Sequence, residues 1–289
     1  MVEPPELRRP TRQQVYRRRL VALVLLAALV GAGLFAAWAA LKNDGSGSPP
    51  PPTTTVAPPK IVKVLFPEGY TRAEMAAAAD RASPAITAAD YLRVTGASPL
   101  PGKFAGDGKS RSLEGFLFPA TYDIYENDTA ATLVHKQQEA FRQNWAKTKL
   151  GYARSKNLTP FDVLTIASMI EKEAVVDSER PLIAAVIYNR LHSRIPLGID
   201  ATIRYALRIP GTESLTKEDL RNPTPYNTRL YRGLPPGPIA NPGLKSIQAA
   251  AHPAKVDYLY FVAKPDKKHH FFTSSFQEFE AYKAEHGYG

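Results

Sequence analysis

The pattern of hydrophobic and polar positions is clearest near the middle of the chain, where a helix is predicted to begin. Thr159 is a typical N-cap, Pro160 suits the first helical position, and Asp162 is the acid three places after the cap. The positions that follow place apolar side chains on one helix face, at Ile166, Met169 and Ile170. We therefore expect this face to pack into the core.

Two acids end this helix, and they point in different directions. Glu173 lies seven residues after Ile166, on the apolar face. Glu171 lies about 200° away around the helix, so the two cannot form a carboxylate pair on one face. A carboxylate held against apolar neighbours is easier to protonate, which a general acid requires near neutral pH. The alternative is that Glu173 is a solvated residue or an ion-pair partner, as glutamates near helix ends usually are.

An uncharged stretch of 22 residues, 20–41, follows an arginine-rich tail, 1–19. A helix of that length reaches about 33 Å, enough to span a bilayer core. The arginines predict a cytoplasmic tail, one transmembrane helix and an exported remainder. The competing interpretation is a cleaved signal peptide with a site at 37–39, although its apolar region would ordinarily be only about 7–15 residues long.

The rest of the chain reads as a linker, a small lobe and a larger domain. Residues 42–60 are rich in Pro, Thr, Ser and Gly and are expected to form an extended tether. A strand at 61–66 and two short helices predict an accessory lobe over 61–112. Residues 113–289 are expected to be a mixed α/β domain, so the fold class is α+β. Within that domain we expect helices near 128–149, 160–173, 178–191, 200–207, 244–251 and after 275, and a hairpin of 258–262 with 270–273.

Two loops stiffened by proline, 222–228 and 233–243, present polar side chains on rigid supports. Such loops can hold sugar hydroxyls at little ordering cost. The alternative is a rigid surface connection. The side chains predicted to contact sugar are Tyr226, Asn227, Thr228 and Asn241.

Composition excludes several functions. The chain has no cysteine, so thiol catalysis, disulfides and a lipid-modified N-terminal cysteine are ruled out. Half of the net charge of +10 precedes Ile61, and no basic run is interleaved with aromatics, so we predict no nucleic-acid partner. The remaining charge suits an anionic polymer such as a cell-wall glycan. His269 and His270 are adjacent on a predicted strand and point to opposite faces, so we predict no metal and no cofactor.

Several sequence words in fixed order closely resemble the YceG-like endolytic murein transglycosylases, over roughly 61–282. The resemblance implies a single-pass inner-membrane lyase that cuts the β-1,4 bond between N-acetylmuramic acid and N-acetylglucosamine in nascent peptidoglycan strands. It also implies peptidoglycan synthases of the elongation or division machinery as partners. By the family pattern the catalytic acid is Glu173, the second Glu of Glu-Lys-Glu. The words that resemble the family are 166–173, 186–191, 225–228, 233–243 and 250–254.

Two departures from the family pattern stand out. Ala120 occupies the place where the family commonly has an Asp, so any role of that acid is absent or taken over by Asp123. Many members also have a longer LysM-like lobe, of which only the last part, around 67–71, is recognisable here.

One carboxyl group can perform this cleavage. If the sugar's own 6-hydroxyl attacks, Glu173 can donate a proton and then accept one, and the product is a 1,6-anhydro sugar. We therefore expect Glu173→Gln to abolish cleavage and Glu171→Gln to leave most of it. A rival hypothesis is a hydrolase in which Asp200 or Glu114 supplies a second carboxylate. Another is a non-catalytic cell-wall-binding scaffold protein.

Overall fold

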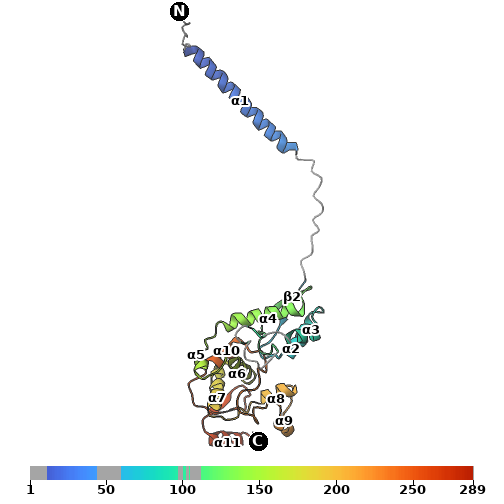
Figure 1. Cartoon of the computed structure of the whole chain (residues 1–289), viewed down its shortest axis with the longest axis vertical. Coiled ribbons are helices and arrows are strands. Elements are labelled where there is room, and N and C mark those ends of the chain that lie inside the picture. The colour runs from blue at the N-terminus through green and yellow to red at the C-terminus, as the bar shows by residue number, and fades with distance from the viewer. Residues whose placement is uncertain (1–11, 44–59, 97–99, 102–103, 105–111, 289) are drawn as a thin grey trace, which may run out of the picture. The chain divides into compact units, whose positions relative to one another are not determined.

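The structure is a computed structural model that describes residues 12–43, 60–96, 100–101, 104 and 112–288. It comprises two compact units, residues 1–58 and residues 59–289. Helix α1 (Arg12–Asn43) forms the described part of the first unit, and the second contains the other elements labelled in Figure 1.

Helix α1 includes the apolar stretch 20–41, and the large apolar side chains that the structure describes there, such as Leu29 and Leu34, are exposed. Among the helices that the structure describes, none is long and apolar enough to cross a membrane. The predicted transmembrane helix is therefore not confirmed. Most of the predicted tail, 1–11, and of the predicted linker, 44–59, lies outside the described residues.

The predicted accessory lobe shares a sheet with the predicted larger domain. Strand β1 (Ile61–Leu65) pairs in antiparallel register with β2 (Thr121–Tyr125), and Val64 faces Tyr122. The strand at β1 was predicted, whereas β2 was missed. Because this ladder and a common hydrophobic core cross residue 112, the predicted boundary there does not divide the second unit, and a separate LysM-like lobe is not confirmed. The two helices that follow β1, α2 (Arg72–Ala82) and α3 (Ala88–Gly96), lie where they were predicted.

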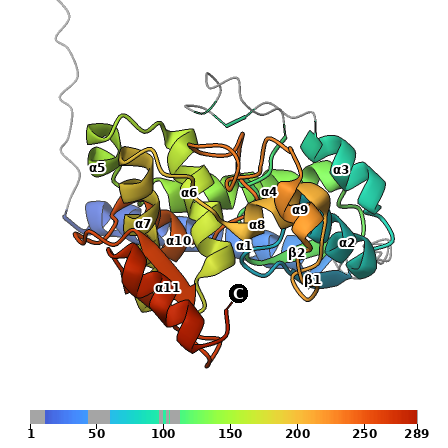
Figure 2. The same ribbon diagram turned by 90° about the horizontal axis from the view of Figure 1, so that it is seen from below.

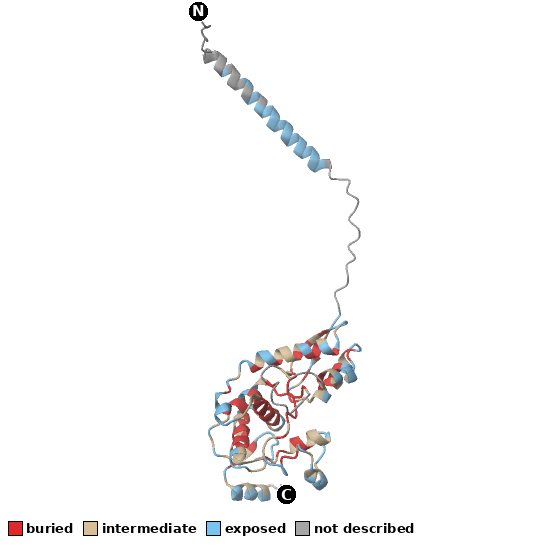
Figure 3. Ribbon diagram, in the orientation of Figure 1, coloured by how far each residue is buried: buried red, intermediate tan, exposed pale blue. Residues whose placement is uncertain are grey.

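Helix α6 (Pro160–Glu173) lies at the centre of the second unit, among α7 (Arg180–His192), α8 (Asp200–Leu207) and α10 (Leu244–Ala251) (Figures 1 and 3). It begins with the predicted cap: the Thr159 hydroxyl accepts from the backbone N–H of Asp162 at 3.1 Å, and the Asp162 carboxylate accepts from that of Thr159 at 2.9 Å. Residues 161–170 are all buried. The helix is thus buried on every side rather than on one face, and its hydroxyl side chains bond to carbonyls of the preceding turn.

The elements around α6 follow the prediction with shifted ends. The helix predicted at 128–149 is shorter, and the one predicted from 178 begins at Arg180, after a 3-10 turn, η3 (Asp177–Glu179). The C-terminal hairpin and α11, red in Figure 2, lie at one edge of the unit. The remaining bounds are α4 Ala130–Trp145, α5 Gly151–Ser155, α9 Lys217–Arg221, β3 Tyr260–Ala263, β4 His270–Thr273 and α11 Phe276–Glu285.

Candidate active site

Glu173 is the last residue of α6, and its surroundings favour a protonated carboxyl group. The residue is partly buried, and no described residue donates a hydrogen bond to its carboxylate. Burial, and secondly the nearby charge of Asp200, raise the pKa of Glu173 to about 7, while Arg204 and Arg229 act in the opposite direction. A carboxyl group with this pKa exists in both protonation states near neutral pH, as an acid that must donate and then accept a proton requires.

The acid whose charge raises the pKa of Glu173, Asp200, already has an ion-pair partner. Asp200 is the first residue of α8, and its carboxylate accepts a hydrogen bond from Nε of Arg229 at 2.6 Å. Both side chains of this ion pair are 43% exposed, so they remain accessible to a ligand. Arg204, one helical turn after Asp200, donates to the carbonyls of Pro210 and Glu213. The site therefore combines one protonatable carboxyl group with a solvent-accessible acid–arginine pair.

Glu114, the other candidate for a second carboxylate, has a structural role. Its side chain is buried and accepts the backbone N–H of Arg72 at 2.9 and 3.1 Å, the Tyr205 hydroxyl at 3.2 Å and the Asn241 amide at 3.0 Å. Burial raises the pKa of Glu114 to about 7, and the backbone N–H of Arg72 opposes that rise. Because protein donors occupy its carboxylate, Glu114 joins the start of α2 to α8 and does not serve as a second catalytic acid.

Asn241 was predicted to contact sugar, and the structure corrects this prediction. Its side chain is fully buried. The amide oxygen accepts from the backbone N–H of Leu117 at 2.9 Å, and the amide nitrogen donates to the carbonyl of Tyr70 at 2.9 Å and to Glu114. These bonds tie together three segments that lie far apart in the sequence, so Asn241 shapes the fold and is not available to a ligand.

Asn227 and Thr228 need the same correction. Asn227 is fully buried, donates to the carbonyls of Leu220 and Asn222, and accepts from the backbone N–H groups of Arg229 and Leu230. The Thr228 hydroxyl is 2% exposed and accepts from the backbone N–H of Ile199 at 3.0 Å. Both side chains form hydrogen bonds with backbone groups of this protein, because the polar groups of a buried loop need partners within the protein.

Tyr226 is the only one of the four predicted sugar-binding residues whose side chain is not fully buried. Its ring packs on that of Tyr205, with the centroids 5.1 Å apart. Burial raises the pKa of the Tyr226 hydroxyl, and so does the charge of Glu114. A partly open aromatic face next to a polar tip is suited to a sugar ring, so the contact of Tyr226 with substrate stays a prediction.

The second proline-stiffened loop lies along α6. The backbone N–H of Ile239 donates to the buried hydroxyl of Ser168 at 3.0 Å. The backbone N–H of Gly243 donates to the carboxylate of Glu171 at 2.9 Å. Polar side chains in the buried helix therefore hold the loop through its backbone, which explains why Ser168 is tolerated in an otherwise apolar stretch.

Glu171 is a structural residue that the helical pattern did not identify. Its side chain is 5% exposed and pairs with Nη1 of Arg180 at 3.2 Å. Arg180 also donates to the hydroxyl of Ser246 and to Asp177. The helical pattern predicted the direction of the Glu171 side chain, but its partners, Arg180 on α7 and the backbone N–H of Gly243 just before α10, lie later in the chain.

The two adjacent histidines bind different acids. Nδ1 of His270 lies 2.7 Å from the buried carboxylate of Glu179, and Nδ1 of the exposed His269 lies 2.8 Å from that of Asp266. Within the described part of the chain, no three His, Cys, Asp or Glu side chains are grouped as metal ligands would be.

Comparison with known proteins finds a family model and relatives that match residues of the second unit. A model of the YceG-like family matches residues 47–285. The endolytic murein transglycosylase of Bacillus subtilis (strain 168) is 43% identical over 152 residues, which cover 53% of this chain and 42% of that protein. That of Streptococcus pneumoniae (strain ATCC BAA-255 / R6) is 38% identical over 185 residues, which cover 62% of this chain and 33% of that protein. The chain thus matches less than half the length of these two relatives.

A solved structure resembles the fold as well. The crystal structure of a YceG-like protein from Listeria monocytogenes superimposes with a TM-score of 0.66 and 33% sequence identity. The match covers 79% of this chain and 77% of the Listeria chain.

Proposed function

The chain belongs to the YceG-like family, and from this premise we propose that it is an endolytic murein transglycosylase. It cleaves the bond between N-acetylmuramic acid and N-acetylglucosamine within a peptidoglycan strand and leaves a 1,6-anhydro end. The curated relatives that bear this name support the proposal. A single observation assigns the reaction to one residue: the carboxyl group of Glu173 has a pKa raised to about 7 and no hydrogen-bond donor among the described residues.

The chemistry needs one group that works twice. Protonated Glu173 gives its proton to the glycosidic oxygen, which leaves as the hydroxyl of the N-acetylglucosamine product. The 6-hydroxyl of the muramic acid then attacks the anomeric carbon and returns its proton to Glu173. No water is consumed and the carboxyl group ends in its starting state. An attacking hydroxyl that is already attached to the sugar reacts without a bimolecular entropy cost, so no second carboxylate is needed to activate a nucleophile.

Asp200 and Arg229 tune this group. The negative charge of Asp200 disfavours ionisation of Glu173, whereas Arg229 favours it. While the two form an ion pair, their effects on Glu173 partly cancel. We assign to this pair a secondary adjustment of the pKa of Glu173, beyond the larger effect of burial, and to the carboxylate of Asp200 stabilisation of the positive charge that develops on the anomeric carbon as the bond breaks.

The proposal is tested by incubating purified glycan strands with the full chain and identifying the products by mass spectrometry. We expect anhydro ends from the wild type, none from Glu173→Gln, and unchanged products from Glu126→Gln, which alters an exposed glutamate after β2. Ends that retain the elements of water would instead favour the two-carboxylate hydrolase, with Asp200 as the second acid. Binding of strands without cleavage by the wild type would favour the scaffold protein.

We further propose that residues 20–41 anchor the chain in the cell membrane, with the tail 1–19 in the cytoplasm and the catalytic unit on the exported side. The support is the sequence alone: an uncharged stretch of 22 residues preceded by arginines. The test is fractionation, in which the full-length chain should stay with membranes after an alkaline wash. A mature chain that begins near Ala40 and is released by salt would contradict the proposal.

Peptidoglycan synthases are the partners that we propose, on the family resemblance alone. Crosslinking in cells should recover such a synthase with the wild-type chain. It should recover the synthase equally with Glu173→Gln, because recognition does not depend on cleavage.

A further inference from the structure

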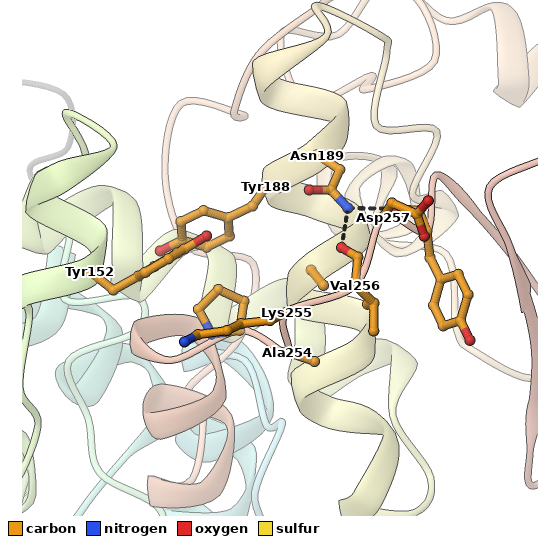
Figure 4. Close-up of a pocket in the computed structure, with 10 residues that line it drawn as sticks. Tyr152, Tyr188, Asn189, Ala254, Lys255, Val256 and Asp257 are labelled. Atoms are coloured by element: carbon orange, nitrogen blue, oxygen red, sulfur yellow. Dashed lines mark hydrogen bonds between the residues drawn. The ribbon is translucent and has the colours of Figure 1, made fainter.

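A cavity of about 560 Å³ lies between α5, the second half of α7 and the segment 253–258 (Figure 4). This volume falls within the range of small-ligand sites. Two of the sequence words that the proposed reaction leaves unused, 186–191 and 250–254, contribute to its walls. The residues that line it include Tyr152, Tyr188, Asn189, Lys255, Asp257 and Tyr258.

The walls of this cavity are fixed by hydrogen bonds. The amide of Asn189 donates to the carbonyls of Val256 and Tyr258, both at 2.9 Å, as the dashed lines in Figure 4 show for this amide. The Tyr188 hydroxyl donates to the carbonyl of Ala250 at 2.7 Å. A ligand would therefore enter a site that is already ordered. Its binding free energy would not include an entropy cost for ordering the segment 253–258.

Two opposite charges on this wall have no partner in the described part of the chain. Neither Lys255 nor Asp257 takes part in an ion pair there, and both residues are exposed. In Figure 4 the Lys255 ammonium points toward Tyr152, while Asp257 lies on the other side of the segment. The exposed ring of Tyr152 adds an apolar face between polar groups.

The cavity is separate from the proposed catalytic acid. Tyr188 lies close enough to Asp162, near the start of α6, for the charge of Asp162 to contribute to the raised pKa of Tyr188. Glu173 ends the same helix, and its 14 residues span about 20 Å. A ligand in the cavity therefore does not occupy the site of bond cleavage.

We propose that this cavity binds the short peptide that peptidoglycan carries on its muramic acid. This inference rests on the proposed function and adds a subsite for the peptide to it. A bare sugar chain without its peptides carries only the lactyl carboxylates of its muramic acids, so it could pair with Lys255 but would leave Asp257 without a cation. A peptide with a free carboxylate and a free side-chain amine pairs with both, and its backbone can pack on the ring of Tyr152. In an extended form, five residues reach about 17 Å, which suits an open cavity of this kind.

The test measures binding by calorimetry to the full chain, with muramic acid bearing a pentapeptide that ends in a free carboxylate and contains a lysine-type amine. This ligand has no glycosidic bond to cleave, so its binding is independent of the proposed activity. We expect Lys255→Gln and Asp257→Asn each to weaken binding by roughly three- to tenfold. Lys264→Gln, at a partly exposed lysine that does not line the cavity, is the matched control and should bind as the wild type does.

Modified ligands assign each charge. A peptide whose carboxylate is amidated should be insensitive to Lys255→Gln, and one whose amine is acetylated should be insensitive to Asp257→Asn. A peptide-free disaccharide that binds as well as the peptide ligand would make this a glycan subsite and overturn the proposal. Absence of peptide binding by a chain that still cleaves strands would refute the subsite while leaving the proposed function intact.

Discussion

Replacing Glu171 by glutamine should destabilise the protein, although this residue is not the proposed acid. The two carboxylate oxygens of Glu171 accept from different donors, Nη1 of Arg180 and the backbone N–H of Gly243. Glutamine offers one oxygen and one NH₂ group, so one of these donors would face another donor. The side chains of Glu171 and Arg180 are only 5% and 9% exposed, so solvent cannot replace the lost partner.

The magnitude follows from this burial. Removing one member of a buried ion pair typically costs about 3–5 kcal/mol. Arg180 keeps its bonds to Asp177 and Ser246, so we expect the lower end, about 3 kcal/mol. For a unit of this size, that change lowers the unfolding temperature by roughly 6–12 °C.

Thermal unfolding followed by circular dichroism measures this effect. Glu280→Gln is the matched control, because it breaks an exposed pair with Lys283 on α11 and should shift the midpoint by no more than about 3 °C. At temperatures where the variant is folded, we still expect Glu171→Gln to keep most of the cleavage. An unchanged midpoint for Glu171→Gln would refute the assignment of this carboxylate as a buried tie between α6, α7 and the loop.

Three other outcomes are expected. Cleavage by the wild type should decline as pH rises through the pKa of Glu173, about 7, because only the protonated form starts the reaction. In pH–rate profiles, Asp200→Asn should move this decline to lower pH and Arg229→Gln should move it to higher pH. Asn227→Ala should cost about 2–3 kcal/mol in urea unfolding, since it leaves buried backbone groups without partners. Gly115→Ala should lower the unfolding temperature, because a Cβ there would lie 2.6 Å from Pro238 on a backbone with φ of +88°.

Local signals in the sequence were sufficient for much of the fold. The start of α6 was predictable because Thr159, Pro160 and Asp162 determine the cap among themselves. Strand β2 was missed because it is defined by pairing with β1, some 60 residues earlier in the chain, as in the pair Lys63 and Asp123. The strand propensities of a short segment do not show which distant segment it will pair with.

The sequence predicted the burial that raises the pKa of Glu173, whereas the catalytic role of Glu173 stays a prediction. Glu173 falls on a face whose periodicity is visible in the sequence, and burial is the main cause of its raised pKa. The roles of Asn227 and Asn241 could not be deduced in this way, because an amide in a stiff loop can face a ligand or the chain's own carbonyls. Only the folded arrangement shows that both amides are buried and bonded to the protein.

The most direct test of the central claim is to cleave glycan strands in water labelled with oxygen-18 and to determine the mass of the new ends. If Glu173 acts alone and the sugar's 6-hydroxyl is the nucleophile, the new muramic acid ends are anhydro sugars that contain no label, and Glu173→Gln forms none. Labelled ends from the wild type would show that water attacks, and the account of Glu173 as a single acid and base would be wrong.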